Sequence, residues 1–202
     1  MVYILSFDIG IRNLAYCYSN DHNIIKWNVM DIQGDNVNAT CEKCVRLLHE
    51  TFKDDPIDQV LIENQPVQKN PTMKTIQIVV YTYFVHAKVL RVNNRVDNIN
   101  FISAIRKNKY TDKFDIHVEC KTKYQQNKKR AIACAKLLVE HTEWEDHFRN
   151  HKKKDDLADS YLQTLSFINH IPVLPKPQDP LSVDGSSSTS STSHTEILLS
   201  NS

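Results

Sequence analysis

Apolar residues follow two different rhythms along the chain, and each rhythm predicts a different kind of element. Short runs rich in β-branched and aromatic residues predict strands over 2–7, 14–19, 23–29, 58–64 and 98–103. Longer stretches with apolar residues on one helical face predict helices over 38–52, 71–90, 124–141 and 155–170. The segment "RKNKYTDKF", residues 106–114, shows neither rhythm and is predicted to be a polar loop.

The order of these elements predicts an α/β fold with a mixed sheet. The first three strands are separated by little more than turns such as "SNDHN", which favours an antiparallel meander. The two later strands are reached through helices, which favours parallel strands joined by crossover connections. We therefore expect a five-stranded mixed sheet flanked by helices.

The composition changes near Pro172. The segment "PVLPKPQDP" is rich in proline, and "DGSSSTSSTSHTE" is a low-complexity Ser/Thr stretch. Such a segment buries too little apolar surface to offset the entropy lost on ordering. We predict one folded domain over residues 1–172 and a disordered tail over 173–202, in which "EILLS" is either a docking motif or an idle end.

Bulk composition limits the cellular setting more than the function. A formal net charge of +1 names no partner, and 41% hydrophobic residues is ordinary for a globular chain. No apolar run approaches the roughly 20 residues that a membrane span needs, and the N-terminus lacks the features of a signal peptide. Five cysteines, an odd number, suit a reducing compartment. We expect no membrane partner and a cytoplasmic or nuclear location, or a viral factory in an infected cell.

A single C-x-x-C pair, Cys41 and Cys44, admits two interpretations. With His49 it offers three ligands, whereas a zinc site needs about four. The pair also lies within a helical apolar pattern, which favours a packing role over a metal or redox role.

Carboxylates lie at the ends of apolar elements. Asp8 and Glu63 each end a predicted buried strand, where an unpaired charge would be costly. At the start of the last helix, Asp155, Asp156 and Asp159 have three- and four-residue spacings that share one helix face. If the first and fourth strands lie side by side under that helix, these side chains converge.

Converging carboxylates repel one another, and a hard divalent cation such as magnesium or manganese relieves the repulsion. Two such ions can hold the attacking and leaving oxygens of a phosphodiester. Each acid taken singly also has a structural interpretation: Asp8 as a turn cap, Asp155 and Asp156 as helix starters, and Glu63 as a partner of Lys69 or Lys74.

Four motifs, "FDIGIRN", "LIENQP", "NKKRAI" and "KKDDLADS", together resemble the poxvirus-type Holliday junction resolvases. These enzymes are relatives of the bacterial RuvC and fungal mitochondrial resolvases in the ribonuclease H-like superfamily. The resemblance covers about residues 2–170. It implies a ribonuclease H-like sheet and a magnesium site of four carboxylates, which are Asp8, Glu63, Asp156 and Asp159. It favours Asp156 over Asp155 because the paired family aspartates are three apart.

The resemblance also implies a lysine near the scissile phosphate, for which Lys128 and Lys129 are equal candidates. Neighbouring basic residues are expected to contact DNA phosphates: Lys121, Lys123, Lys128, Lys129, Arg130, Lys152, Lys153 and Lys154.

The implied activity is that of a structure-selective endodeoxyribonuclease. It would use two magnesium ions, which manganese could replace, and no small-molecule cofactor. It would resolve four-way junctions by paired symmetric nicks that leave 5′-phosphates and 3′-hydroxyls, in recombination, repair or viral genome processing.

Two symmetric cuts imply a homodimer, with the Val79, Val80 and Phe84 side of helix 71–90 as a candidate surface. Tyr81, Tyr83 and Phe84 are either wedges at a junction or, as the helical pattern favours, core residues.

Three alternatives stay open. The chain could be a related nuclease that acts on other branched DNA or on RNA–DNA hybrids, or a junction-binding protein without catalysis. An actin-like kinase would need several glycine-rich phosphate loops, whereas the three glycines include only Gly10 in such a place.

Overall fold

The computed structural model describes residues 1–66, 68, 70–90 and 96–169. The predicted tail, 173–202, lies outside the described residues.

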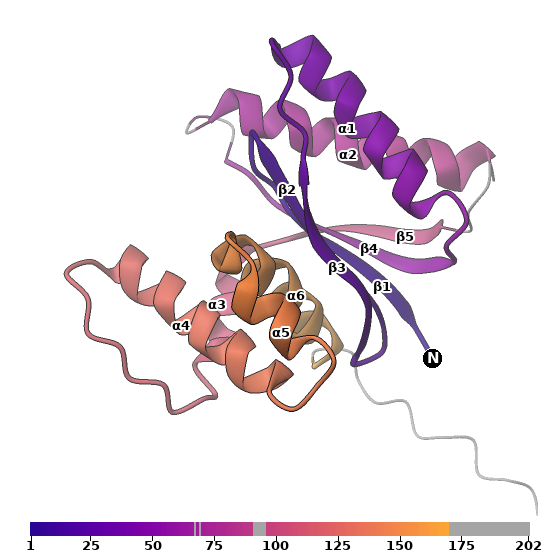
Figure 1. Cartoon of the computed structure of the whole chain (residues 1–202). Helices are drawn as coiled ribbons and strands as arrows, with labels where there is room; N and C mark the ends of the chain where they lie inside the picture. The colour runs from indigo at the N-terminus through magenta and orange to yellow at the C-terminus, as the bar shows by residue number, and fades with distance from the viewer. Residues whose placement is uncertain (67, 69, 91–95, 170–202) are drawn as a thin grey trace, which may run out of the picture. The chain divides into compact units, whose positions relative to one another are not determined.

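One five-stranded sheet organises the chain, and it confirms the predicted mixed topology (Figure 1). The strand order is β3-β2-β1-β4-β5. β1 pairs antiparallel with β2, and β2 with β3, whereas β4 runs parallel to both β1 and β5. The strands are β1 (Tyr3–Asp8), β2 (Asn13–Asn20), β3 (Asn23–Asp31), β4 (Ile57–Glu63) and β5 (Val96–Ile102).

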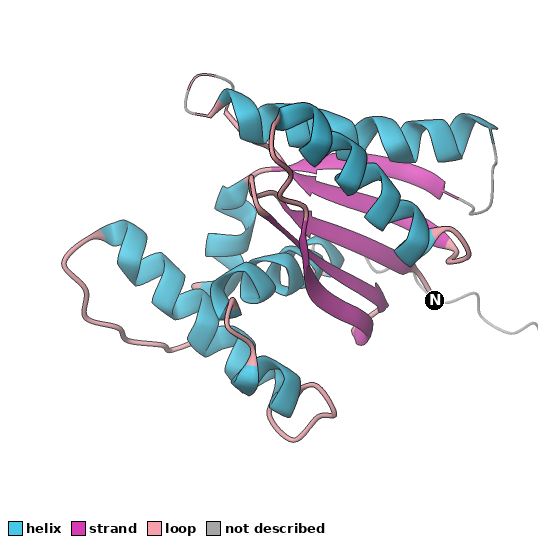
Figure 2. Cartoon of the chain, turned by 45° about the horizontal axis from the view of Figure 1, so that its top comes forward, coloured by secondary structure: helices cyan, strands magenta, loops and turns pink. Residues whose placement is uncertain are grey.

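The first face of the sheet is covered by α1 (Val37–Phe52) and α2 (Pro71–Leu90) (Figures 1 and 2). Side chains alternate between the faces of a strand, so Phe7 of β1 points toward these helices. Its ring packs against Phe84 of α2 and Phe52 of α1, with centroids 5.6 and 5.9 Å away. α2 forms despite its β-branched residues because the Asn70 side chain caps it, accepting from the Met73 amide at 3.1 Å, and Pro71 follows.

The second face is covered by helices from the C-terminal half of the described chain, seen on the other side of the sheet in Figure 2. α6 crosses the central strands, and Trp27 of β3 anchors it by donating to the Leu157 carbonyl at 3.0 Å. The same indole stacks on Phe148 at 5.3 Å. These helices are α3 (Ala104–Thr111), α4 (Lys123–Val139), α5 (Glu145–Asn150) and α6 (Lys154–Ile168).

The predicted polar loop over 106–114 is wrong, because most of it lies in α3. The Ser103 side chain caps this helix by accepting from the Ile105 amide, and the buried side chains of Lys107 and Tyr110 attach it to the domain. α5 was not predicted either. The other predicted strands and helices lie within two residues of the observed bounds.

The α2 helix corrects one expectation about its surface. Val80 and Phe84 are fully buried in the core, so they are not available to a dimer partner, whereas Val79 is only partly covered. Tyr81 stacks on Phe101 at 5.0 Å and packs against the same core as Phe84. Both residues therefore agree with the prediction that these aromatic side chains pack in the domain. Within the described ranges, no helix combines the length and apolar character that crossing a bilayer requires.

Cys44 packs in the same core as Phe84, and burial raises the pKa of its thiol to about 12. Its complete burial among apolar side chains favours the packing role for this residue.

Candidate active site

Asp8 and Glu63 lie side by side at one edge of the sheet. β1 and β4 are parallel neighbours in which Phe7 is level with Ile62, so the next residues on both strands are also level. Both acids belong to the face that packs against α6, because they share the alternation of Ser6 and Leu61. The adjacency of the two strands, on which the predicted convergence depended, is therefore observed.

α6 brings the other acids to the same place. A cavity of about 640 Å³ is lined by five carboxylates and three lysines from the strand ends and from α3, α4 and the start of α6: Asp8, Glu63, Asp155, Asp156, Asp159, Lys107, Lys128 and Lys153.

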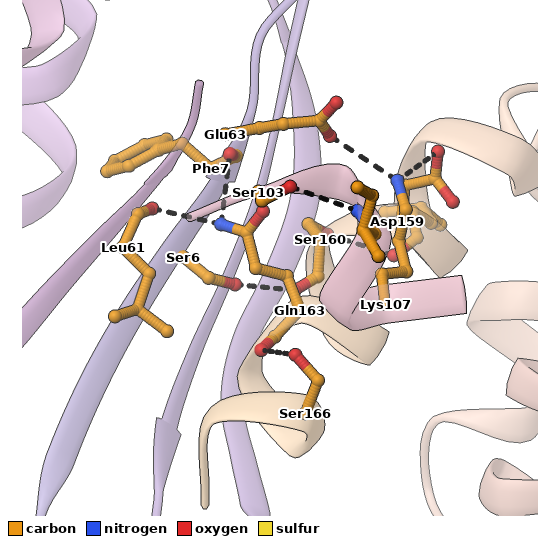
Figure 3. Close-up of polar contacts among 12 residues, drawn as sticks. Ser6, Phe7, Leu61, Glu63, Ser103, Lys107, Asp159, Ser160, Gln163 and Ser166 are labelled. Atoms are coloured by element: carbon orange, nitrogen blue, oxygen red, sulfur yellow. Dashed lines mark hydrogen bonds and ion pairs between the residues drawn. The ribbon is translucent and has the colours of Figure 1, made fainter. Parts of the chain in front are cut away.

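Lys107 is the residue that the sequence prediction missed. Its side chain reaches the carboxylates from α3, with Nζ 2.7 Å from Asp159 Oδ2 and 3.3 Å from Glu63 Oε2 (Figure 3). Burial lowers the pKa of Lys107, but the Asp159, Glu63 and Asp8 carboxylates outweigh that effect and raise it, so the ammonium stays charged. Ser103 as an N-cap, followed by Ala104, Lys107 and Tyr110 at three-residue spacing, is the signal that could have revealed the helix.

Burial and mutual repulsion raise the pKa values of three carboxylates in the cavity. Burial raises the pKa of Asp8 well above its usual value, and Glu63 and Asp159 raise it further. Burial also raises the pKa of Asp159, where the Lys107 ammonium opposes the effect. For Asp156, burial and the neighbouring Asp155 carboxylate raise the pKa to about 6. These acids thus form a site that a further cation would stabilise.

The two candidate lysines of α4 have different surroundings. Lys128 lines the cavity and forms an ion pair with Asp155, which lowers the pKa of that carboxyl against the effect of burial. Lys129 is exposed and is not among the residues that line the cavity.

Of the other basic residues predicted to contact DNA, only Lys153 is among the residues that line the cavity. Lys121 and Lys123 are exposed at the approach to α4, and Lys152 and Lys153 are exposed before α6, whereas Lys154 is partly covered. Arg130 differs because its guanidinium pairs with Asp112 at 2.5 Å and only 20% of its side chain is exposed.

The donor set fits a hard divalent cation, since carboxylate oxygens are the ligands that magnesium and manganese prefer. Asp8, Glu63, Asp156 and Asp159, the four carboxylates that the resemblance implies, all line the cavity and could hold it. Among the described residues, no three His, Cys, Asp or Glu side chains are already gathered as a metal-binding cluster. Instead, the Lys107 ammonium contacts both Glu63 and Asp159 and supplies positive charge there.

Buried polar groups on α6 fix the strand ends that carry the acids. The Gln163 amide nitrogen donates to the Phe7 carbonyl at 3.3 Å and to the Leu61 carbonyl at 3.2 Å (Figure 3). One side chain thereby ties β1, β4 and α6 together next to Asp8 and Glu63. Ser6 adds a hydrogen bond to the Ser160 carbonyl at 2.5 Å.

Comparison with known sequences decides the family. The family model for the poxvirus A22 protein matches residues 2–170, nearly all of the described chain. The chain belongs to the poxvirus A22 protein family. This membership confirms the resemblance to the poxvirus-type Holliday junction resolvases that the four sequence motifs indicated.

The individual proteins that match this A22 family member have low sequence identity to it. The chain is 32% identical over 127 residues to the uncharacterized protein L451 of Acanthamoeba polyphaga mimivirus, a match that covers 57% of this chain and 30% of that protein. The yeast mitochondrial Holliday junction resolvase Ydc2 has the same fold, with a TM-score of 0.57, 16% identity, and coverage of 83% of this chain and 79% of its own. The fowlpox virus resolvase, solved with its Holliday junction substrate, matches with a TM-score of 0.48 and 21% identity, over 82% and 98% of the two chains.

Proposed function

We propose that this A22 family member is a magnesium-dependent endonuclease that resolves four-way DNA junctions by paired symmetric nicks. The observation that carries the proposal is the single cavity in which Asp8 and Glu63, level on parallel strands, meet Asp156 and Asp159 of α6. Family membership supports the proposed substrate class, because the sequence motifs of this chain resemble those of Holliday junction resolvases.

The four carboxylates would hold magnesium or manganese beside the scissile phosphate. When bound, two such ions supply Lewis acidity that stabilises the charge developing on the phosphodiester. Lys107 pairs with Glu63 and Asp159, and its ammonium would add positive charge that stabilises the transition state of the phosphate reaction. Lys128 and Lys153, at the same cavity, would bind flanking phosphates and position the strand without reading its sequence.

Isosteric neutralisation of the carboxylates tests this proposal. Asp8→Asn and Glu63→Gln should each lower the cleavage rate of a synthetic four-way junction in magnesium by at least roughly 100-fold. Both variants should still bind the junction in a gel-shift assay, because the lysines are intact. Asp54→Asn is the matched control, since Asp54 is an exposed acid outside the cavity. Wild-type cleavage by either cavity variant would refute the assignment.

The same assay separates the proposed substrate from its alternatives. A junction resolvase should cut the four-way junction faster than flaps, forks or RNA–DNA hybrids of the same sequence. A faster rate on a hybrid or flap would favour a related nuclease of the same superfamily. Binding without cleavage under either magnesium or manganese would favour a scaffold role.

Symmetric cuts on two strands require two active sites, so we also propose that the protein acts as a homodimer. The open side of α2, where Ile78 and Val79 line an apolar groove with Val45 of α1, remains available for contact. Light scattering should give twice the chain mass at concentrations that support paired nicking. A monomer that makes both nicks within one binding event would contradict this part of the proposal.

A further inference from the structure

The cavity rim carries an aromatic ring that the chemistry above does not use. Tyr124, in the first turn of α4, is 73% exposed and lines the same cavity as the carboxylates. Among the described phenylalanine, tyrosine and tryptophan residues, the only other exposed ring is that of Phe101, which is 44% exposed and stacks on Tyr81 at 5.0 Å. Tyr124 has no such ring partner among the described residues.

The position of this ring is fixed by its helix. The Thr122 side chain caps α4 by accepting from the Gln125 amide at 3.2 Å, which defines the turn that carries Tyr124. One turn further on, Lys128 is tied to Asp155 at the cavity. The ring therefore projects from a capped helix end whose next turn is fastened to the carboxylate site.

A second apolar side chain reaches the cavity from another element. Ile11, in the β1–β2 turn, is 45% exposed and also lines it. The turn is tight, because a Cβ on Gly10 would overlap the Asn13 carbonyl oxygen. The site thus presents apolar surface from two elements beside carboxylates and lysines, a combination that suits a base and its phosphates better than a second protein.

We propose that Tyr124 forms a nucleobase-stacking subsite. Its ring receives an unpaired base of the DNA strand whose phosphate lies at the carboxylates. Aromatic rings accept any base because every base has a π face, so the subsite binds unstacked DNA without sequence preference. A fully paired duplex offers no free base face, so the subsite favours the branch point of a junction. This inference rests on the proposed function for the identity of the DNA.

Metal-free binding tests the subsite apart from catalysis. Four-way junctions carrying 2-aminopurine at single positions around the crossover are titrated with the full chain in EDTA. One position should show a fluorescence change on binding. Tyr124→Ala should abolish that change and weaken junction affinity by roughly 5- to 150-fold, the range expected for one stacked base. Tyr124→Phe should keep both, because the ring face rather than the hydroxyl makes the contact.

Leu137→Ala is the matched control, since Leu137 is 52% exposed near the other end of α4 and does not line the cavity. It should bind as the wild type does, and thermal melting should show all three variants folded. Wild-type affinity and fluorescence in Tyr124→Ala would overturn the subsite, as would a Phe variant as weak as the Ala variant.

The two proposals fail in different ways. If wild-type protein shows the fluorescence change but never cleaves in magnesium or manganese, the nuclease function fails and the subsite stands. If Asp8→Asn abolishes cleavage while Tyr124→Ala binds and cleaves normally, the subsite fails and the function stands. If wild-type protein does not bind the junction, both fall.

Discussion

Both faces of the sheet are packed with apolar side chains, but they differ in the buried hydrogen bonds at the centre of each contact. Toward α1 and α2, side chains such as Phe7, Phe52 and Phe84 make an apolar core with edge-on and tilted rings. Toward α6, buried hydroxyl and amide groups of Ser6 and Gln163 lie at the centre of the contact and are hydrogen-bonded.

This difference matches the location of the site. Apolar burial is strong but non-directional, so it stabilises a layer without fixing any atom to a fraction of an ångström. Hydrogen bonds fix direction and distance, and they are costly to leave unmade inside a protein. The carboxylates lie on the hydrogen-bonded face, where Gln163 and Lys107 determine their positions. We expect damage to the first face to reduce stability alone, and damage to the second to reduce catalysis beyond its effect on stability.

The largest loss of stability should follow Phe84→Ala in the apolar core. Truncating a fully buried phenylalanine removes apolar contact and leaves a cavity, which lowers the free energy of unfolding by about 3–5 kcal/mol. Urea denaturation measures this loss, and Phe84→Leu should lose less. Junction cleavage per folded molecule should stay at the wild-type rate in both. A specific loss of activity would show that this face also positions the site.

Lys107→Met should come next, because it removes the cation that Glu63 and Asp159 share. Glu63 and Asp159 then lose their charged partner inside the protein. Without metal, the free energy of unfolding should fall by about 3 kcal/mol. Adding Glu63→Gln should recover part of this loss, since one of the repelling charges is then gone. A double-mutant cycle by urea denaturation at neutral pH measures the coupling. Strict additivity would mean that the ammonium does not balance Glu63.

Gln163→Leu should cost about 1–3 kcal/mol, because two strand carbonyls lose their donor. Cleavage per folded molecule should also fall by roughly tenfold or more, since small displacements of reacting groups are costly. Phe84→Leu is the comparison, as it loses stability on the other face. Equal cleavage rates for the two variants, after correction for the folded fraction, would end the distinction between the faces.

The smallest effect should be a pH dependence of metal-free stability. The pKa values of Asp8 and Asp159 are raised, and that of Asp156 is raised to about 6, so the folded chain binds these protons more tightly than the unfolded chain. Stability from these groups is therefore lost as pH rises through the folded pKa values. The melting temperature should fall between pH 5 and pH 7.5, at roughly 2–4 °C per kcal/mol.

Two comparisons check the origin of that slope. Asp156→Asn should flatten it between about pH 4 and pH 6, because its own titration is removed. Magnesium should raise the melting temperature more at pH 7.5 than at pH 5, because it binds the ionised carboxylates. If neither Asp8→Asn nor Asp156→Asn changes the slope, groups outside this site cause the pH dependence.

Most of the scaffold could be predicted from local patterns in the sequence. Short apolar runs rich in β-branched and aromatic residues predicted the five strands. The Asn70–Pro71 start and uninterrupted length of α2 indicated a helix despite its β-branched residues. Placing acids at the ends of apolar elements also identified Asp8, Glu63 and the start of α6 as candidates for one site. Such signals are local, because alternation, capping and burial at a strand end are properties of neighbouring residues.

Which charges meet depends on how the strands and helices pack in three dimensions. The parallel pairing of β1 with β4 makes Asp8 level with Glu63, and no property of either segment alone specifies that register. α3 is short and polar, so its pattern is too weak to distinguish from a loop. Its Lys107, rather than a lysine of α4, contacts Glu63 and Asp159 because packing of α3 on α6 buries that ammonium among carboxylates distant in the chain. The electrostatic energy of two charges depends on their distance in space. These ion pairs could therefore not be predicted from positions along the chain.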